Sequence, residues 1–185
     1  MIRSVLVKGD LTALRRAVES KGRALDLSDF RRASPQVRGA MLAAAELATE
    51  DLSRWAVLGW NGECSVRENV AYWRDYTGAG RQLARAALFV PTLPSIPACE
   101  AAIAVGAHGE VCYYRTAADT AALAELVEDA FAVADPPDGV LAIESSADAA
   151  CAVRIARGDR LPGGFATLRE LHLSLNGESK ETKLP

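Results

Sequence analysis

The clearest potential for chemistry lies where a predicted strand is followed at once by a helix. The stretch GEVCYYRTAADTAALAELVEDAF, residues 109–131, predicts a strand, a helix and, between them, a sharp junction of Thr116, Ala117, Ala118, Asp119 and Thr120. In many α/β enzymes such a junction holds a nucleophile, because a helix N-terminus stabilises negative charge. Here that position is Ala118, which carries no reactive atom. Asp119 is expected to cap the helix through its carboxylate.

The other candidates for reactive chemistry are four cysteines: Cys64, Cys99, Cys112 and Cys151. They form no C-x-x-C pair, and His108 and His172 are too few to complete a site, so no metal is expected. Cys112 lies in the middle of the predicted strand, where a cysteine usually packs as a small hydrophobe. It is retained as the candidate reactive thiol. Cys64 lies near a helix start, which favours a thiolate, but no partner base is evident.

Composition and absent motifs exclude several classes of function. The net charge is −3 and the arginines are scattered, so nucleic acid is not an expected partner. No glycine-rich turn stands between a strand and a helix as a phosphate loop requires, and G-x-S-x-G is absent, so no cofactor is expected. No apolar run is long enough to span a membrane, and the first one is too short for a signal peptide. We therefore expect a cytoplasmic protein with reduced thiols.

Hydrophobic periodicity and capping residues predict strands and helices that follow one another along the chain. Strands are expected at residues 2–7, 55–60, 109–114, 139–145 and 151–158. Helices are expected at residues 11–24, 33–52, 65–76, 98–106 and 119–134. The second is expected to start at the N-cap Ser34 with Pro35 at its first position, and the third at the N-cap Ser65. This order predicts a layered α/β domain at residues 1–160, with a mostly parallel five-stranded sheet and helices on both faces. Residues 161–185 are expected to form a C-terminal extension, with a strand or short helix near 165–175 and a polar tail.

Aromatic side chains gather in one part of the sequence: Trp55, Trp60, Tyr72, Trp73 and Tyr76. Packing in the core or in a local cluster is the favoured interpretation. The alternative is an interface, because such side chains dominate the energetics of protein contacts.

From about Arg31 to Gly158 the chain resembles the N-terminal half of β-ketoacyl synthases, which have the thiolase-like fold. Four stretches carry the resemblance in order: RRASPQVRGAMLAAAELA, LFVPTLPSIPACEAAIAVGAHG, GEVCYYRTAADTAALAELVEDAF and DGVLAIESSAD. The third is similar to the catalytic strand, elbow and buried helix of that family. The family places its cysteine after a Thr-Ala pair, where this chain has Ala118. Its catalytic histidines and lysine belong to a C-terminal half that has no counterpart in these 185 residues.

The resemblance implies a thiolase-like half-fold without the Cys-His-His machinery. In the family, the strand before the elbow pairs with its twin across a two-fold axis, and the helix after it is buried between two halves. A half-fold would expose the apolar arc of the helix at 119–134, so an oligomer is expected. The implied partners are a second copy or a full-length ketosynthase, with an acyl carrier protein as a further candidate.

Three functions follow from the sequence. The first is a non-catalytic ketosynthase-like subunit or scaffold in fatty-acid or polyketide-type biosynthesis. The second is a module that binds acyl groups or acyl carrier species without chemistry. The third is an acyltransferase that uses a cysteine such as Cys112 or Cys64.

Overall fold

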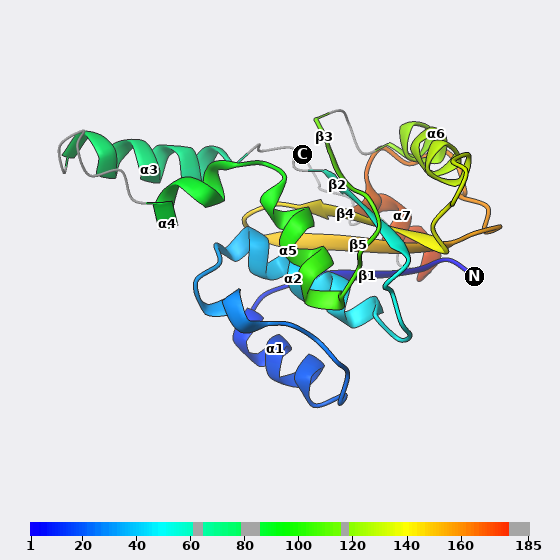
Figure 1. Cartoon of the computed structure of the whole chain (residues 1–185), viewed down its shortest axis with the longest axis horizontal. Helices are drawn as coiled ribbons and strands as arrows, with labels where there is room; N and C mark the ends of the chain where they lie inside the picture. Colours follow the sequence, from blue (N-terminus) through cyan, green and yellow to red (C-terminus); the bar gives the residue numbers. More distant parts are fainter. Residues whose placement is uncertain (61–64, 79–85, 116–118, 178–185) are drawn as a thin grey trace.

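A computed structural model describes residues 1–60, 65–78, 86–115 and 119–177 (Figure 1). At its centre is one sheet of five strands in the order β1-β5-β4-β2-β3. The strands are β1 (Arg3–Lys8), β2 (Trp55–Trp60), β3 (Val111–Tyr114), β4 (Gly139–Ser145) and β5 (Ala149–Ala156). In the described chain β3 pairs on one side with β2, so its other side is an open edge.

The prediction of a mostly parallel sheet is wrong, because the sheet is mixed. β2 runs parallel to β3 and to β4, whereas β5 runs antiparallel to β4 and to β1. Residues 146–148 alone connect β4 to β5, and Ser146 N–H donates to the Ala149 carbonyl at 2.8 Å across this turn. A parallel crossover needs a dozen or more residues, and a connection of this length therefore forces a hairpin.

Helices cover both faces of the sheet, as the sequence predicted (Figure 1). The helical segments are α1 (Leu11–Glu19), η1 (Ser28–Arg31), α2 (Pro35–Leu47), α3 (Val66–Gly78), α4 (Ala86–Phe89), η2 (Val90–Thr92), α5 (Ile96–Val105), α6 (Thr120–Phe131) and α7 (Leu168–Leu175). Helices α2 and α5 pack on one face, and α6 and α7 pack on the other.

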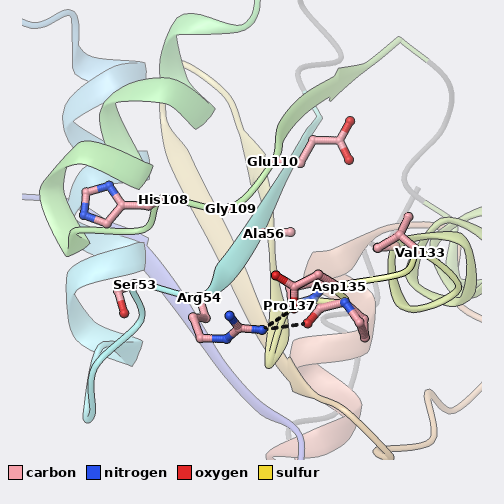
Figure 2. A pocket seen from close by; sticks show the side chains of 11 residues that line it. Ser53, Arg54, Ala56, His108, Gly109, Glu110, Val133, Asp135 and Pro137 are labelled. Carbon is pink, nitrogen blue, oxygen red and sulfur yellow. Dashed lines mark hydrogen bonds and ion pairs between the residues drawn. The ribbon is translucent and has the colours of Figure 1, made fainter.

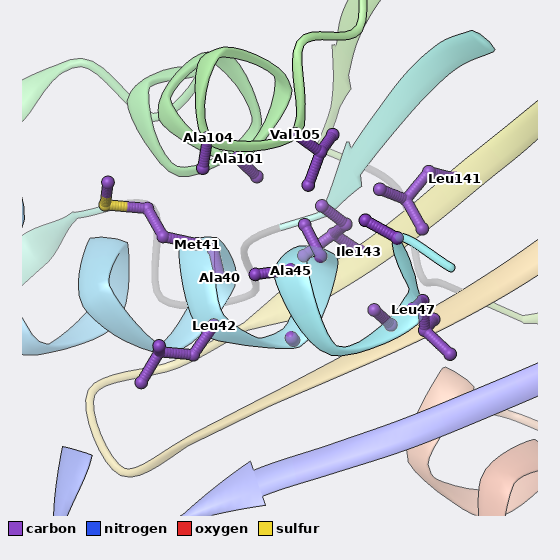
Figure 3. Packing of buried hydrophobic residues seen from close by; sticks show 14 of the residues in the cluster. Ala40, Met41, Leu42, Ala45, Leu47, Ala101, Ala104, Val105, Leu141 and Ile143 are labelled. Carbon is purple, nitrogen blue, oxygen red and sulfur yellow. The ribbon is translucent and has the colours of Figure 1, made fainter. Parts of the chain in front are cut away.

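The larger core lies between the sheet and the pair α2 and α5 (Figure 3). Ser34 caps α2 by accepting from Val37 N–H at 3.4 Å, and Pro35 occupies its first turn, as the sequence predicted. Small side chains such as Ala40 and Ala101 let α2 and α5 approach each other closely, and both are fully buried. Leu141 and Ile143 from β4 fill the space beneath them.

The second core, on the opposite face, unites α6 with α7. Leu123 of α6 and Leu168 and Leu171 of α7 are fully buried there, and Phe131 packs against them partly buried. The sequence predicted either a strand or a short helix near residues 165–175, and the structure has the helix α7 there. This helix helps to cover the face of the sheet on which α6 packs. The large exposed hydrophobic side chains of the described chain do not gather on α6; most lie on α3 and in residues 89–93.

Candidate functional site

The predicted elbow lies between β3 and α6, and Thr116, Ala117 and Ala118 fall outside the described residues. Asp119 is the N-cap of α6, and its Oδ1 accepts from Ala122 N–H at 2.8 Å. Thr120 is the first residue of the helix. The strand and the capped helix that flank the junction are thus present as the sequence predicted.

A row of large side chains crosses the carboxyl ends of the parallel strands before the junction. Trp60 of β2 is level with Tyr114 of β3 on one side and with Glu144 of β4 on the other. The Trp60 and Tyr114 rings stack with centroids 5.5 Å apart. The pKa of Tyr114 is raised to about 12, and burial is the largest cause. A hydrogen bond with Cys112 is the second cause. Trp60 is buried, and its indole Nε1–H has no hydrogen-bond partner among the described residues.

Cys112 lies on β3, two residues before Tyr114, and is half-buried. Its thiol donates to Glu110 Oε1 with a sulfur–oxygen distance of 3.2 Å. Burial raises the pKa of the Cys112 thiol, and Glu110 raises it further, while the hydrogen bond with Tyr114 acts in the opposite direction. A carboxylate as the thiol's acceptor is unlike the cationic or histidine-paired setting that activates a nucleophilic cysteine.

Cys151 and Cys99 are the other two cysteines of the described chain. Cys151 is buried, donates to the Leu168 carbonyl at 3.3 Å, and has a pKa that burial raises to about 12. Cys99 is half-buried on α5, and Cys64 lies outside the described residues. Within the described ranges, no group of three or more histidine, cysteine or carboxylate side chains could hold a metal ion.

Two of the open cavities that described residues line lie near the ends of the parallel strands, and the sequence predicted neither. The first, of about 250 Å³, lies at the amino ends of β2 and β3, away from the elbow (Figure 2). There Arg54 donates to Asp135 at 2.8 Å, and His108 and Glu110 line the same cavity. The ion pair joins residues far apart in sequence, so no local motif could have pointed to it.

The second cavity, of about 240 Å³, lies where β4 ends and α7 begins. Glu144 Oε2 accepts from Leu168 N–H at 3.0 Å at the start of α7, and Arg169 lines the cavity nearby. Burial raises the pKa of Glu144, while the backbone N–H groups of Arg169 and Leu168 lower it. Glu144 therefore tethers the first turn of α7 to the sheet.

None of the helices in the described part of the chain is both long and apolar enough to cross a membrane. The sequence matches no protein-family model and no curated protein. The fold, however, is similar to a chain in the structure of the ketosynthase ApeO in complex with its chain length factor ApeC from Xenorhabdus doucetiae. The TM-score is 0.62 at 13% identity, and the match covers 96% of this chain and 90% of that chain. The two matched chains are therefore of similar length, and this protein has a thiolase-like, ketosynthase-like fold.

Proposed function

We propose that the chain is a non-catalytic ketosynthase-like subunit that associates with a ketosynthase in a fatty-acid or polyketide-type pathway. Residue 118 carries the proposal. The chain keeps the strand before the junction and the capped helix after it, and it has alanine where the resemblance aligns the nucleophilic cysteine. Alanine cannot form a thioester with an acyl group. The chain therefore has the strand and the helix that flank the nucleophile position, but not the nucleophile.

The surroundings of the described thiols support the same conclusion. An acyltransferase that used Cys112 would need a thiolate at neutral pH, and burial and Glu110 both raise the pKa of that thiol. Cys151 is buried, with a pKa of about 12. Neither cysteine has the environment of an activated nucleophile.

The likeness to a complex of a ketosynthase with its chain length factor supports a role beside a catalytic subunit. The open edge of β3 is the proposed contact, because an unpaired edge strand is a template for pairing with another chain. The partner strand would extend the sheet beyond β3. A second copy is the alternative partner for this edge, and an acyl carrier protein is a further candidate for the complex.

Affinity purification of the tagged chain from its native host tests the association. The expected result is a ketosynthase with its own Cys-His-His set, identified by mass spectrometry and recovered in a fixed ratio to the bait. Recovery of a monomer without any ketosynthase would contradict the proposal. A preparation from cells that express the tag alone is the control.

Intact-protein mass spectrometry after incubation with acyl-CoA tests the absence of catalysis. The mass is expected to stay unchanged, because position 118 has no thiol. A stoichiometric acyl adduct that survives unfolding would overturn the non-catalytic assignment.

A further inference from the structure

Helices α3 and α4 and the turn η2 form an arm, defined here as residues 66–78 and 86–93, that extends away from the sheet (Figure 1). None of the 13 residues of α3 is buried in the described structure. Helices of this length are marginal in water without tertiary packing. We therefore expect another protein surface to pack against α3.

One side of α3 faces the rest of the arm. The Tyr72 ring meets the Phe89 ring edge-on at 5.6 Å and stacks with the Tyr76 ring at 5.9 Å. Asn69 Nδ2 donates to the Thr92 carbonyl at 3.4 Å. These contacts hold α3 against α4 and η2 and leave a different face of the helix outward.

The outward face is an apolar stripe of Val66, Val70 and Trp73, which are 58%, 43% and 59% exposed. Their spacing of i, i+4 and i+7 aligns them along one side of the helix. Phe89, Val90 and Leu93 are also exposed, so the arm holds six of the ten exposed large hydrophobic side chains in the described chain. Such a concentration marks an interaction surface, and stripes with this spacing are the anchors by which helices dock into apolar grooves.

Charges on α3 limit what can cover the stripe. At about 100° per residue, Arg67 and Arg74 lie together along one edge of the stripe, and Glu68 and Asp75 lie on the far side of the helix. In an antiparallel two-fold pair of α3 helices, the arginine edges of the two copies would face each other and repel. The stripe therefore fits a different surface, one that is apolar with acidic residues along one edge.

The size of the β3 edge gives a second reason why the arm is needed. β3 has 4 residues and is about 13 Å long, whereas a standard interface buries about 800 Å² on each partner. Pairing along an edge of that length buries too little surface to form a standard interface by itself. Tyr113 of β3, Pro97 of α5 and Pro94, which directly follows the arm, line one small depression, so the arm joins the rest of the chain near β3.

We infer that the stripe of α3 packs into an apolar groove of the ketosynthase subunit that pairs with β3, with acidic residues of that groove facing Arg67 and Arg74. This inference rests on the proposed function and assigns the surface through which the association takes place. The β3 edge sets the alignment of the two subunits, and the arm supplies most of the buried apolar area.

Affinity purification with single variants tests the inference. The tagged wild type, Trp73→Asp, Val70→Asp and Val133→Asp are each purified from the native host, and the ketosynthase in each preparation is identified and quantified. Val133 is the matched control, since it is 53% exposed and lines the cavity at the opposite ends of the parallel strands. The two arm variants are expected to lose the ketosynthase at least tenfold, whereas Val133→Asp retains it. Circular dichroism and urea unfolding confirm that each variant folds.

The outcomes separate the inference from the proposed function. If the wild type and the arm variants retain equal amounts of ketosynthase, the arm is not the contact and the proposed function stands. If the wild type retains none, the proposed function fails and the inference fails with it. A wild-type homodimer that Trp73→Asp dissociates would assign the stripe to a second copy and overturn the inference.

Arg74→Glu tests the acidic edge of the ketosynthase groove. This variant is expected to lower retention of the ketosynthase severalfold, and unchanged retention would contradict the acidic edge.

Tryptophan quenching gives an independent readout on the purified complex. Trp73 is 59% exposed, whereas Trp55 and Trp60 are 3% and 2% exposed, so acrylamide reaches chiefly Trp73 in the free chain. The difference in quenching between wild type and Trp73→Phe isolates this residue, even when the ketosynthase adds its own tryptophans. The difference is expected to fall severalfold in the complex. An undiminished difference means that the stripe stays exposed and overturns the inference.

Discussion

Two thiols of the described chain, Cys112 and Cys151, have surroundings that on balance oppose ionisation. Cys112 donates to the Glu110 carboxylate and is half-buried, and Cys151 is buried beneath the start of α7. Both pKa values are raised, with burial as the largest cause. The sequence identified Cys112 as the candidate thiol by its place before the junction, but it could not place the Glu110 carboxylate oxygen within hydrogen-bond distance of the sulfur.

Alkylation at pH 7.5 measures the consequence. Cys112 is expected to react with iodoacetamide more slowly than a free model thiol, because a raised pKa lowers the thiolate fraction. Cys151 is expected to react only after unfolding in urea. Glu110→Gln removes the carboxylate that raises the pKa of Cys112 and is expected to accelerate its alkylation. Peptide mass spectrometry reads each site, and alkylation of Cys112 faster than the model thiol would revive the acyltransferase alternative.

Gly109, just before β3, has no room for a side chain. A Cβ there would lie 2.4 Å from the Trp55 carbonyl oxygen, which belongs to the backbone of the neighbouring strand and cannot move aside. Gly109→Ala is therefore expected to lower the free energy of unfolding by about 1–3 kcal/mol in urea titrations. Gly163→Ala is the control, because no atom beyond its two chain neighbours lies within 4 Å of its Cβ position. Equal stability of the two variants would show that β3 can shift away from β2.

At the scale of elements, local signals in the sequence predicted most helices and strands but not the direction of every strand. Ser34 with Pro35 fixed the start of α2, and Gly106, at φ +68°, ends α5 as expected. The antiparallel β5 was missed, although the short connection after β4 leaves no room for a crossover helix. The expected N-cap at Ser65 has φ +58°, a left-handed conformation unlike the extended backbone of an N-cap. Local spacing cannot reveal such a backbone conformation.

The Asp119 cap fixes where α6 begins, and its contribution can be measured directly. Asp119→Ala removes the acceptor of the Ala122 N–H bond and is expected to cost about 1 kcal/mol in the free energy of unfolding. Asp119→Asn keeps an acceptor oxygen and is expected to retain most of that stability. If the alanine variant were as stable as the asparagine variant, the cap would not stabilise the helix.

Glu144 links the stability of α7 to pH. Burial raises its pKa above the ordinary value of 4.5, so the folded protein holds this proton more tightly than the unfolded chain. Its stabilising contribution is full below the ordinary pKa and is lost as the pH rises through the folded pKa. The difference in unfolding free energy between wild type and Glu144→Gln is therefore expected to decrease as the pH rises from about 4 to 7.

Urea midpoints of both proteins across that pH range provide the measurement. Arg169 and Glu170 also act on the Glu144 carboxyl, in opposite directions, and both are unchanged in the variant. Glu128→Gln, at an exposed position on α6, controls for the loss of one negative charge. A difference that increases with pH would show that the N–H groups of α7 outweigh burial.

At the scale of the whole molecule, the sheet is covered on both faces by this one chain, and most of the large exposed hydrophobic side chains in the described residues lie on the arm. The resemblance to half of a synthase led to the expectation that the second face would lie bare around α6. Instead Leu168 and Leu171 of α7 are fully buried in the same core cluster as Leu123 of α6, so α7 helps to cover that face. A local signal marks the start of α7, because Thr167 is its N-cap and accepts from Glu170 N–H at 3.1 Å, and the helix packs against β1 and β5.

If α7 is part of one cooperative core, a truncation of Leu171 should destabilise the whole molecule. Leu171 is fully buried, whereas Leu175, one turn later on the same helix, is 40% exposed. Leu171→Ala is expected to cost about 2–5 kcal/mol of unfolding free energy, and Leu175→Ala about 1 kcal/mol or less. Far-UV circular dichroism reports the helices, and the buried Trp55 and Trp60 report the sheet by fluorescence. Coincident transitions at a lower urea concentration in Leu171→Ala would place residues 161–177 within the folding unit of residues 1–160. Loss of helix signal ahead of an unchanged fluorescence transition would instead make them an appended segment, as the sequence predicted.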